Sequence, residues 1–599
     1  MGLPQTKITA LIRMAVVTAA VVWVGLSAGH LSAFAQQAAD GISPETATAL
    51  RAKNDELPVR ADKWMVSVAN PYAAEAAAQV LRDGGSAADA AIVAQLVLGL
   101  VEPQSSGLGG GAFLVYYDAK AGKLTTLDGR ETAPLAATPE LFLGENGEPL
   151  RFFDAVVGGR SVGTPGTPAL LEAMSKRWGK LDWASLFDPA IDLAEGGFIV
   201  TPRLAALVSR GADRLSRFEE TRAYFFPGGQ AITAGDRKTN AAYAGVLKSL
   251  ASQGAKVFYE GPLAQKIVDT VVSAPGNPGL LTMKDMAAYA VKEREPVCAT
   301  YRGNEVCGMG PPSSGALTVG QILGLLEPFD LASLGPQSIE SWRLIGDASR
   351  LAFADRGRYM ADSDFVKMPT KGLLKPSYLK SRSSLLAGEK ALGSVSAGEP
   401  EWDDAALDLA DDESLELPST THFSIVDGDG NIVSMTSTIE NGFGSRLMVE
   451  GFLLNNELTD FSFRPEKDGK PVANRVEPGK RPRSSMSPTI VLRDGKPVLA
   501  IGSPGGSRII GYVAKTIIAH LDWGMDIQAA ISSPHLVNRF GTYDLEAGTL
   551  AESLDQDLTA LGYKTKVRNL NSGLHGIAIT PEGLSGGADP RREGIVLGE

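Results

Sequence analysis

Apolar and polar residues alternate along residues 420–427 and again along residues 432–439. Between these runs lies Asp-Gly-Asp-Gly, a sequence that forms tight turns, so the pattern predicts a β-hairpin. Alternation with a period of two places side chains on opposite faces of the first strand: Thr421, Phe423 and Ile425 on one face, and Thr420, His422, Ser424 and Val426 on the other. We expect the second strand to bring Thr436 and Thr438 back near Thr420.

Upstream of the hairpin, the patterns predict a strand and two helices. Residues 65–69 indicate the strand, and Pro71 begins the first helix. Ser86 is the expected N-cap of the second helix, with Asp89 at its third position. Because residues 90–101 are nearly all apolar, this second helix should be buried.

A glycine cluster at residues 104–111 leads into a strand–turn–strand pattern over residues 112–127. The cluster lacks Gly-Lys-Ser/Thr and leads into a strand rather than out of one, so close backbone packing explains it better than phosphate binding. Residues 139–390 are mainly helical in pattern, and the chain beyond 420 is rich in strands, with a second hairpin over residues 487–502. This mixture suits sheets that are covered by helices.

The composition changes sharply just before the first hairpin. Residues 391–419 contain no Lys or Arg but carry nine acidic residues, so we expect a solvated and mobile run. Such a run, ending at a strand that opens with Thr, suggests cleavage between Ser419 and Thr420. The free α-amine of Thr420, with a pKa of about 8, could then take the proton of its own hydroxyl. The alternative is an ordinary linker before a core hairpin, and this stretch alone leaves both possibilities open.

Two motifs carry a resemblance to a known family. They are TTHFSIVD, from Thr420 to Asp427, and GFLLNNELTDFS, from Gly451 to Ser462. Together with further motifs from about residue 69 to near the C-terminus, they make the chain similar to the γ-glutamyltransferase family. The resemblance implies an α/β (α+β) fold, a four-layer αββα sandwich of the N-terminal-nucleophile hydrolase type, formed by two subunits from one precursor that cleaves itself.

The resemblance also implies how the chain is divided and what it does. The large subunit would span residues 36–419 and the small subunit residues 420–599, and the two would stay paired as a heterodimer. Thr420 would attack the γ-carbonyl of a γ-glutamyl amide such as glutathione and form a γ-glutamyl-Thr acyl-enzyme. Water, an amino acid or a dipeptide would then take the acyl group.

Catalytic roles follow from positions that match the family's motifs. Thr438 is expected to hydrogen-bond near the nucleophile. The backbone N–H groups of Gly505 and Gly506, in a tight loop after a strand, match the oxyanion hole, where one lost donor typically costs about a hundred-fold or more in rate.

Substrate-binding roles follow in the same way. Arg130, helped by Ser484 and Ser485, matches the ligand of the donor's α-carboxylate, for which the guanidinium fork is well suited. Glu457 and Asp460 match the ligands of the donor's α-ammonium.

The chain departs from the family pattern at Glu440, where many members have an Asn that helps to bind the donor's amino end. Three carboxylates around one ammonium would mean either that one is protonated or that Glu440 points elsewhere. Residues 461–483, where some members carry a longer lid with a tyrosine, contain no Tyr or Trp here. We therefore expect an open pocket, activity that favours hydrolysis, and weak stimulation by dipeptide acceptors.

The N-terminus has the pattern of a secretory signal peptide over residues 1–35. Two basic residues precede an apolar run over residues 15–26, and Ala33-Phe-Ala35 follows as the expected cleavage site. The apolar run is short for a bilayer span, which favours cleavage over an uncleaved anchor. We expect a soluble, secreted protein, periplasmic or extracellular, and the net charge of -12 argues against nucleic acid as a partner.

Other candidate residues are weaker. Cys298 and Cys307 flank a predicted turn and could pair or remain two buried thiols. None of the five histidines has metal-ligand spacing to another, so no metal or other cofactor is expected. The Gly-x-Ser-x-Gly matches around Ser161 and Ser585 lack the context of a nucleophile elbow. We expect the charged residues of 347–356, on a helix, to be structural salt-bridge partners.

Two other functions remain open at this point. A cephalosporin or glutaryl-amide acylase shares the implied fold but acts on an acyl group without an α-amine. A secreted binding protein could keep the fold and never mature. A γ-glutamyl and a glutaryl anilide would separate the two enzymes, and a non-maturing chain would stay as one band on an SDS gel.

Overall fold

The computed structural model describes residues 43–599 except 403, 413, 415 and 418. The expected signal peptide therefore lies outside the described residues. The chain divides into an N-terminal unit that ends at Thr48 and a second unit, residues 49–599, which holds both sheets and the candidate site.

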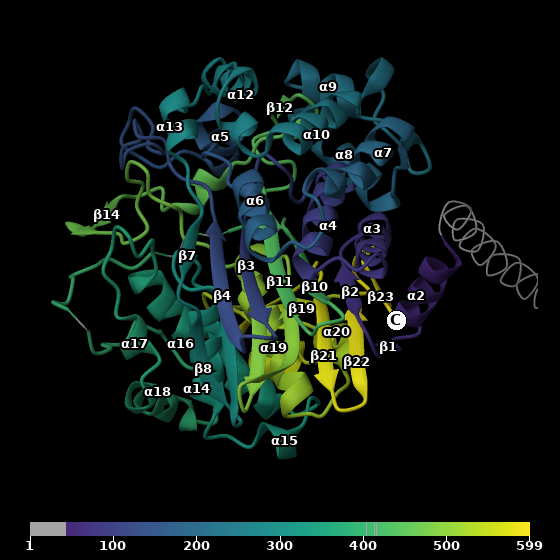
Figure 1. Cartoon of the computed structure of the whole chain (residues 1–599). Helices are drawn as coiled ribbons and strands as arrows, with labels where there is room; N and C mark the ends of the chain where they lie inside the picture. Colours follow the sequence, from purple (N-terminus) through teal and green to yellow (C-terminus); the bar gives the residue numbers. More distant parts are fainter. Residues whose placement is uncertain (1–42, 403, 413, 415, 418) are drawn as a thin grey trace, which may run out of the picture. The chain divides into compact units, whose positions relative to one another are not determined.

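Two antiparallel sheets of seven strands each form the centre of the second unit (Figure 1). The first sheet runs, in spatial order, through β23 (Ile595–Gly598), β2 (Met65–Val68), β10 (Thr421–Val426), β11 (Ile432–Thr438), β3 (Gly111–Asp118), β4 (Lys123–Gly129) and β7 (Lys292–Arg294). The second runs through β1 (Val59–Ala61), β22 (Gly583–Ala588), β21 (His575–Thr580), β17 (Lys496–Gly502), β16 (Thr489–Arg493), β9 (Asn304–Gly308) and β8 (Val297–Tyr301).

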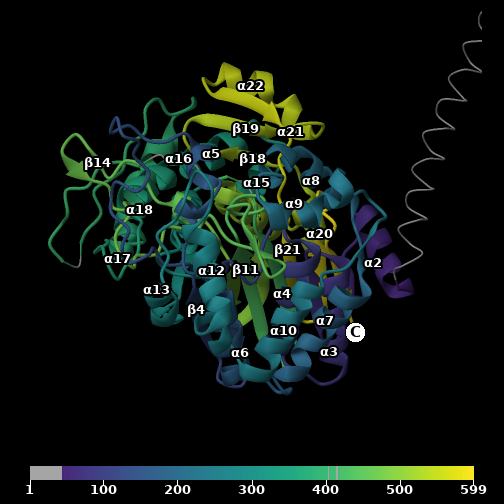
Figure 2. The ribbon, with the colours of Figure 1, turned by 90° about the horizontal axis from the view of Figure 1, so that it is seen from above.

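The sheets pack face to face, and helices cover their outer faces. A buried apolar cluster that includes Val426, Ile432, Ala500 and Ile577 lies between the sheets. The outer face of the first sheet packs against α3 (Pro71–Arg82), α4 (Ala87–Val101) and α6 (Thr167–Trp178), and α7 (Asp188–Gly196) and α10 (Ala241–Gln253) pack against α4. The second sheet packs against α14 (Gly315–Leu326), α19 (Ile509–Leu521) and α20 (Ile527–Ser532), and α16 (Ile339–Tyr359) packs against α14. Figure 2 shows α3, α4, α6 and α10 together on one side of β11 and α16 on the other. The expected four-layer αββα fold is confirmed.

Local sequence signals explain these elements. The hydroxyl of Ser86 and the side chain of Asp89 form the capping box predicted for α4, which is buried along its length. The predicted hairpin is β10–β11, whose alternation sends Phe423 into the cluster under the helices and Val426 into the cluster between the sheets. A Cβ on Gly110 would lie 2.0 Å from the Thr438 carbonyl oxygen, so this glycine permits close backbone packing.

Both sheets combine strands from the two sides of the predicted cut. In the first sheet, β10, β11 and β23 follow residue 419, whereas β2, β3, β4 and β7 precede it. The hairpin β10–β11 is flanked by β2 and β3, so it occupies the centre of the sheet. In the second sheet, β16, β17, β21 and β22 follow the predicted cut and β1, β8 and β9 precede it. The two expected subunits are therefore interleaved in both sheets.

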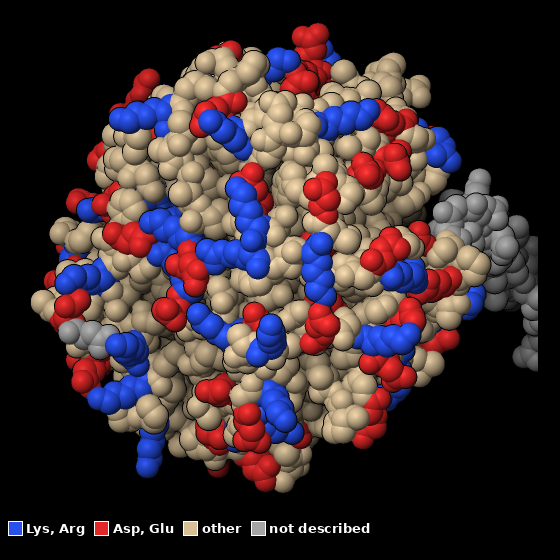
Figure 3. Space-filling view, viewed as in Figure 1, with Lys and Arg blue, Asp and Glu red and all other residues tan. Residues whose placement is uncertain are grey.

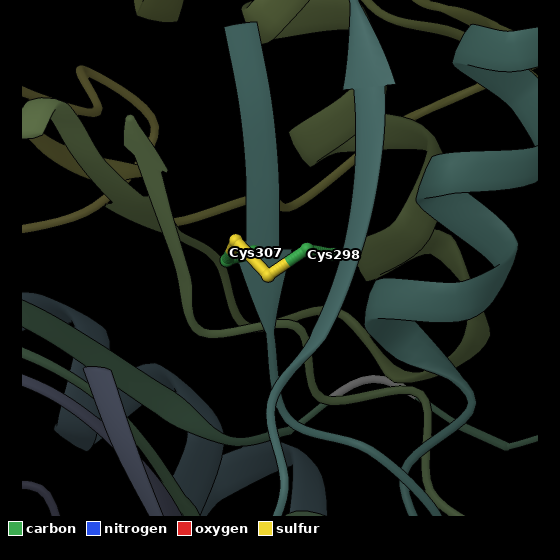
Figure 4. The surroundings of a disulfide bond; sticks show 2 residues. All are labelled: Cys298 and Cys307. Carbon is green, nitrogen blue, oxygen red and sulfur yellow. A yellow bond between two sulfur atoms is a disulfide. The ribbon is translucent and has the colours of Figure 1, made fainter. Parts of the chain in front are cut away.

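Cys298 and Cys307 form a disulfide between β8 and β9, which decides between the two possibilities left by the sequence (Figure 4). Ser161 lies in a short 3-10 turn, η1 (Gly159–Ser161), and Ser585 lies within β22, so neither occupies a strand-to-helix elbow. None of the helices described between residues 43 and 599 is long and apolar enough to cross a membrane.

Peripheral elements complete the described chain. Among the described residues on the face shown in Figure 3, basic and acidic side chains are interspersed. The other helices are α2 (Pro44–Asn54), α5 (Phe152–Val156), α8 (Pro202–Leu215), α9 (Glu219–Phe225), α11 (Lys256–Tyr259), α12 (Pro262–Val272), α13 (Met283–Ala288), α15 (Leu331–Leu334), α17 (Thr370–Leu373), α18 (Pro376–Ser383), α21 (Leu550–Ser553) and α22 (Asp555–Ala560). The other strands are β5 (Phe198–Ile199), β6 (Arg237–Lys238), β12 (Met448–Val449), β13 (Phe452–Leu453), β14 (Glu466–Lys467), β15 (Lys470–Pro471), β18 (Leu536–Asn538), β19 (Thr542–Glu546) and β20 (Lys564–Arg568).

Candidate active site

Thr420 stands immediately before β10, where the hairpin meets the acidic run. Its hydroxyl oxygen lies 3.1 Å from that of Thr438, the last residue of β11. The Thr438 hydroxyl also accepts a 2.8 Å hydrogen bond from the backbone N–H of Glu440. On the other side, the Arg592 guanidinium donates to the Thr420 carbonyl at 3.0 Å. Thr420 has φ = 87°, a strained conformation for a β-branched residue, and these contacts hold it there.

The residue before the predicted cut is also held in place. The Ser419 hydroxyl donates to the Gln104 carbonyl at 2.7 Å, in a buried position. Contacts on both sides of the peptide bond between Ser419 and Thr420 therefore fix it beside the Thr420 hydroxyl, as an intramolecular attack requires.

His422 is the histidine nearest to Thr420 in sequence, but both of its ring nitrogens are hydrogen-bonded elsewhere. One nitrogen lies 2.8 Å from the Thr436 hydroxyl and the other 3.2 Å from the Ser424 hydroxyl. Burial lowers the pKa of His422 well below its ordinary value, so the imidazole is neutral. His422 therefore belongs to the polar packing between the sheets, and the α-amine of a cleaved Thr420 remains the best candidate base.

Gly505 and Gly506 follow β17 and lead through η6 (Gly506–Arg508) into α19. Both have positive φ, of 144° and 59°. A Cβ on Gly505 would lie 2.7 Å from the ring of Tyr512, and one on Gly506 would lie 2.5 Å from the Glu416 carbonyl oxygen. Only glycine fits both positions without strain, and their N–H groups lie at the start of a helix, where backbone donors lack intrahelical partners.

One small cavity gathers most of the residues that the sequence predicts for the site: Arg130, Thr420, Thr438, Glu440, Glu457, Asp460, Ser484, Ser485 and Gly506. Gly505 and Ser419 adjoin it through the chain. Glu416 and Leu417, from the acidic run, also line the cavity and leave a free volume of about 20 Å³. That space is enough for a water molecule and too small for a glutamyl group.

The charged wall of the cavity is defined as Arg130, Glu457 and Asp460, which line the cavity, and Arg356, which contacts the lining residues Glu416 and Ser485. It contains a buried cation, Arg130, whose hydrogen-bond donors are largely used. Arg130 donates to Glu457, to Asp460 at 2.5 Å, and to the carbonyl oxygens of Pro482 and Arg483 at 3.2 and 3.0 Å. Burial opposes its charge, but Glu457 and Asp460 together raise the pKa of Arg130. The expected ligand of a carboxylate and the expected ligands of an ammonium are thus paired with each other in the uncut chain.

Burial raises the pKa values of the carboxyl groups around this cation. The pKa of Asp460 rises to about 7 through burial and then through the charge of Glu416. Burial and Asp460 raise the pKa of Glu440 well above its ordinary value, and burial likewise raises that of Glu457. A ligand cation would favour the ionised forms of these groups, so the cavity is suited to an ammonium.

Comparisons with known proteins agree with this geometry. The family model described as gamma-glutamyltranspeptidase matches residues 73–599. The chain belongs to the gamma-glutamyltranspeptidase family. It is 38% identical over 547 residues to the glutathione hydrolase proenzyme of Bacillus subtilis, covering 89% of this chain and 91% of the relative. It is 36% identical over 548 residues to the glutathione hydrolase proenzyme of Escherichia coli, with the same coverage of both chains.

A solved cephalosporin acylase, from Bacillus halodurans, also shares the fold of the family. Its TM-score is 0.79 at 27% identity, and the match covers 90% of this chain and 97% of that one. The similarity to both kinds of protein means that substrate preference must be argued from the cavity itself.

Glu440, the position at which the sequence was expected to depart from the family pattern, does line the cavity. Its carboxylate accepts a hydrogen bond from the Asn456 amide, and its backbone has φ = 74°. Of the two possibilities left by the sequence, its raised pKa favours a protonated Glu440 over one that points elsewhere.

The acidic run of residues 391–419 differs in part from the sequence expectation. Asp412 and Glu416 are buried, because Asp412 pairs with Arg483 at 2.9 Å and Glu416 pairs with Arg356. The prediction of a wholly solvated run is therefore wrong at these two positions.

Elsewhere the run has the exposure that its composition indicates. The side chains of Glu401 and Asp408 are 68% and 76% exposed, although each contacts a lysine at the surface. Asp403 and Glu413 lie outside the described residues. The run is thus solvated along its earlier part and buried where it reaches the cavity.

Arg356 and Arg592 are site residues that sequence reasoning missed. Arg356 lies on α16, in the stretch whose charges we expected to be structural, yet it donates to the Ser485 hydroxyl at 2.7 Å. Arg592 lies near the C-terminus and contacts the Thr420 carbonyl. The signal that marks both arginines is their burial, which is unusual for this residue type. The local sequence around either residue does not reveal it.

Proposed function

We propose that the chain is a self-processing γ-glutamyl hydrolase and transferase that acts on glutathione and related γ-glutamyl amides. The observation that carries this proposal is a single cavity in which the Thr420–Thr438 hydroxyl pair lies beside buried groups of both charges, Arg130 with Glu457 and Asp460. A zwitterionic amino-acid head needs both kinds of group next to the nucleophile. Membership of a family that includes glutathione hydrolase proenzymes supports the same conclusion.

Maturation comes first in the proposed sequence. The Thr420 hydroxyl oxygen attacks the Ser419 carbonyl carbon, and the hydroxyl proton passes to the amide nitrogen as the C–N bond breaks. The acyl group thus moves from nitrogen to oxygen as an ester. Water then hydrolyses the ester, which leaves a carboxylate on Ser419 and a free α-amine on Thr420. The large subunit would span residues 36–419 and the small subunit residues 420–599.

The mature Thr420 then acts on the donor. Its α-amine takes the hydroxyl proton as the oxygen attacks the γ-carbonyl carbon, and the N–H groups of Gly505 and Gly506 stabilise the oxyanion. The C–N bond of the donor's amide breaks, and the donor's amine leaves with that proton. Water or an acceptor amine then attacks the γ-glutamyl ester and regenerates the Thr420 hydroxyl. Thr438 orients the nucleophile through its hydroxyl.

Recognition of the donor uses the charged residues of the cavity. Arg130 with Ser484 and Ser485 would bind the α-carboxylate, and Glu457, Asp460 and Glu440 would bind the α-ammonium. Because burial disfavours the ionised carboxyl groups unless a cation is near, a glutaryl group without the ammonium would bind less well. None of residues 461–483, the connection expected to form a reduced lid, lines the cavity, which supports activity that favours hydrolysis.

Export is part of the proposal. The N-terminal pattern of residues 1–35 is that of a signal peptide, and a disulfide between Cys298 and Cys307 suits an oxidising compartment. The mature protein would be periplasmic or extracellular.

A pair of anilides tests the proposed activity. Purified mature protein is assayed with γ-glutamyl and glutaryl p-nitroanilide, and we expect a higher kcat/KM for the γ-glutamyl compound, with weak stimulation by dipeptides. Efficient cleavage of the glutaryl compound with no γ-glutamyl activity would instead assign the protein to the acylases.

A further inference from the structure

The cavity of the uncut chain already contains a bound carboxylate, that of Glu416. It pairs with Arg356, and the Nε of Arg483 lies 4.0 Å from it. All three side chains are buried. Burial opposes the charge of Glu416, but Arg356 and Arg483 hold its pKa below the ordinary value, so it is an ionised carboxylate.

Arg356 connects this carboxylate to the donor-binding residues. Its guanidinium donates to the Ser485 hydroxyl at 2.7 Å and to the Ser314 hydroxyl at 2.8 Å, in addition to Glu416. Ser485 is one of the residues assigned above to the donor's α-carboxylate. The fork of Arg130, by contrast, already has four acceptors.

We propose that Arg356, together with Ser485, binds the α-carboxylate of the donor alongside Arg130, and that Glu416 of the uncut chain occupies this position as an internal mimic of the donor. The inference rests on the proposed function and adds a specificity-determining residue to it. It also makes the end of the large subunit a competitor of the donor.

The backbone around Glu416 is seated closely enough to act in this way. The Glu416 carbonyl oxygen lies 2.5 Å from the position of a Cβ on Gly506, and the Asp412 carbonyl oxygen lies 2.5 Å from that of a Cβ on Gly357. Two glycines thus let the chain lie directly against the loop before α19 and against α16. Because Glu416 and Leu417 fill the cavity to about 20 Å³, the donor and this stretch exclude each other.

The first experiment removes Arg356 together with Glu416, since Arg356→Gln alone would leave the Glu416 carboxylate buried without its closest cation. The double variant R356Q/E416Q is compared with E416Q and with R358Q/D411N, which removes the neighbouring, more exposed ion pair. The substrates are γ-glutamyl p-nitroanilide and 4-aminobutanoyl p-nitroanilide, which keeps the ammonium but lacks the α-carboxylate.

We expect E416Q to lower KM for the γ-glutamyl compound and to keep its preference over the 4-aminobutanoyl compound. In R356Q/E416Q that preference, as a ratio of kcat/KM values, should fall at least about ten-fold, as the loss of a hydrogen bond to a charged group predicts. R358Q/D411N should keep the wild-type ratio. If kcat/KM falls equally for both substrates in R356Q/E416Q, Arg356 has a structural role only and the proposal is overturned.

A second experiment needs no variant enzyme to mature. The peptide LADDESLELPS, residues 409–419, is added to wild-type mature protein, alongside the same peptide with the E416Q or the D411N change. We expect competitive inhibition against the γ-glutamyl donor, at least about ten-fold weaker for E416Q and unchanged for D411N. Absence of inhibition, or equal inhibition by all three peptides, would contradict the mimicry. Absence of wild-type activity on the γ-glutamyl anilide would instead refute the proposed function.

Discussion

The hairpin β10–β11 and the charged wall of the cavity meet at one site but are built in different ways. Backbone register places Thr438 beside Thr420, and the flanking strands β2 and β3 hold the hairpin. The charged wall is assembled from Arg130, Arg356 and the neighbouring Glu457 and Asp460, three segments that lie far apart in sequence and are held by ion pairs to one another or to Glu416. The proposed nucleophile, Thr420, is therefore positioned by the backbone of the sheet, whereas the proposed recognition of the donor depends on long-range charge pairs and on protonation.

The largest effect should come from the hairpin. Thr420→Ala removes the attacking oxygen, so the protein should remain one uncleaved and inactive chain. SDS gels and N-terminal sequencing measure this: the small fragment of the wild type should begin Thr-Thr-His-Phe, and the variant should yield no such fragment. Thr420→Ser, which keeps a hydroxyl, is the matched control and should still be cleaved. Normal cleavage of the alanine variant would remove Thr420 from its role.

A smaller effect, on substrate binding and stability rather than on cleavage, should come from the charged wall. Arg130→Ala should raise KM for γ-glutamyl substrates at least about ten-fold, because a bidentate ligand of a carboxylate is lost. It should also lower the thermal midpoint, because Glu457 and Asp460 lose their buried cation, a loss of about 3 kcal/mol or more. Processing should continue, since the Thr420–Thr438 contact does not involve Arg130.

Arg294→Ala is the control that separates the effect of Arg130→Ala on KM from its effect on the thermal midpoint. Arg294 is largely buried and pairs with Asp128 and Asp362, but it does not line the cavity. The Arg294→Ala substitution should lower the thermal midpoint and leave KM for γ-glutamyl substrates unchanged. An Arg130→Ala protein that matures and keeps the wild-type KM would show that Arg130 is not the carboxylate ligand.

The smallest effect should be a pH dependence that is specific to the charged wall. Burial first, and then Glu416, raises the pKa of Asp460 to about 7. Below that pH the carboxyl is protonated in the free enzyme and binds an ammonium less well, and as the pH rises through 7 it ionises and KM falls. The ratio of kcat/KM for γ-glutamyl over glutaryl anilide should therefore drop a few-fold over roughly one pH unit below 7.

The glutaryl compound serves as the reference in this experiment because the α-amine of Thr420 titrates in the same direction for both substrates. In Asp460→Asn the ratio should be lower and independent of pH. A ratio that depends on pH equally in Asp460→Asn and in the wild type would assign the titration to another group.

The sequence predicted the parts of the molecule that are determined locally. Alternation and an Asp-Gly turn were sufficient for β10–β11, and a Ser with an Asp three residues later was sufficient for the start of α4. The αββα layers followed from the resemblance, because the pairing of distant strands is not visible in local patterns. Gly505 and Gly506 stood out in a tight loop after a strand, and their expected role as oxyanion-hole donors came from the resemblance.

Charge pairs formed by distant residues could not be predicted. The acidic run has the composition of a solvated segment, and only the position of Arg356 and Arg483 in the fold makes Asp412 and Glu416 buried partners. For the same reason the charges of α16 were expected to be structural. The two cysteines were ambiguous until the register of β8 and β9 placed them opposite each other.

The interleaving of strands from before and after residue 419 in both sheets has a consequence for refolding. The uncut chain folds in a first-order process, because all strands belong to one molecule. Once the chain is cut, unfolding releases two polypeptides, and restoring either sheet requires their encounter, so the rate of refolding depends on concentration. The disulfide joins two residues that both precede the cut and does not tether the fragments. The uncut chain can unfold and refold reversibly. After cleavage, the lifetime of the folded protein is set instead by its rate of unfolding.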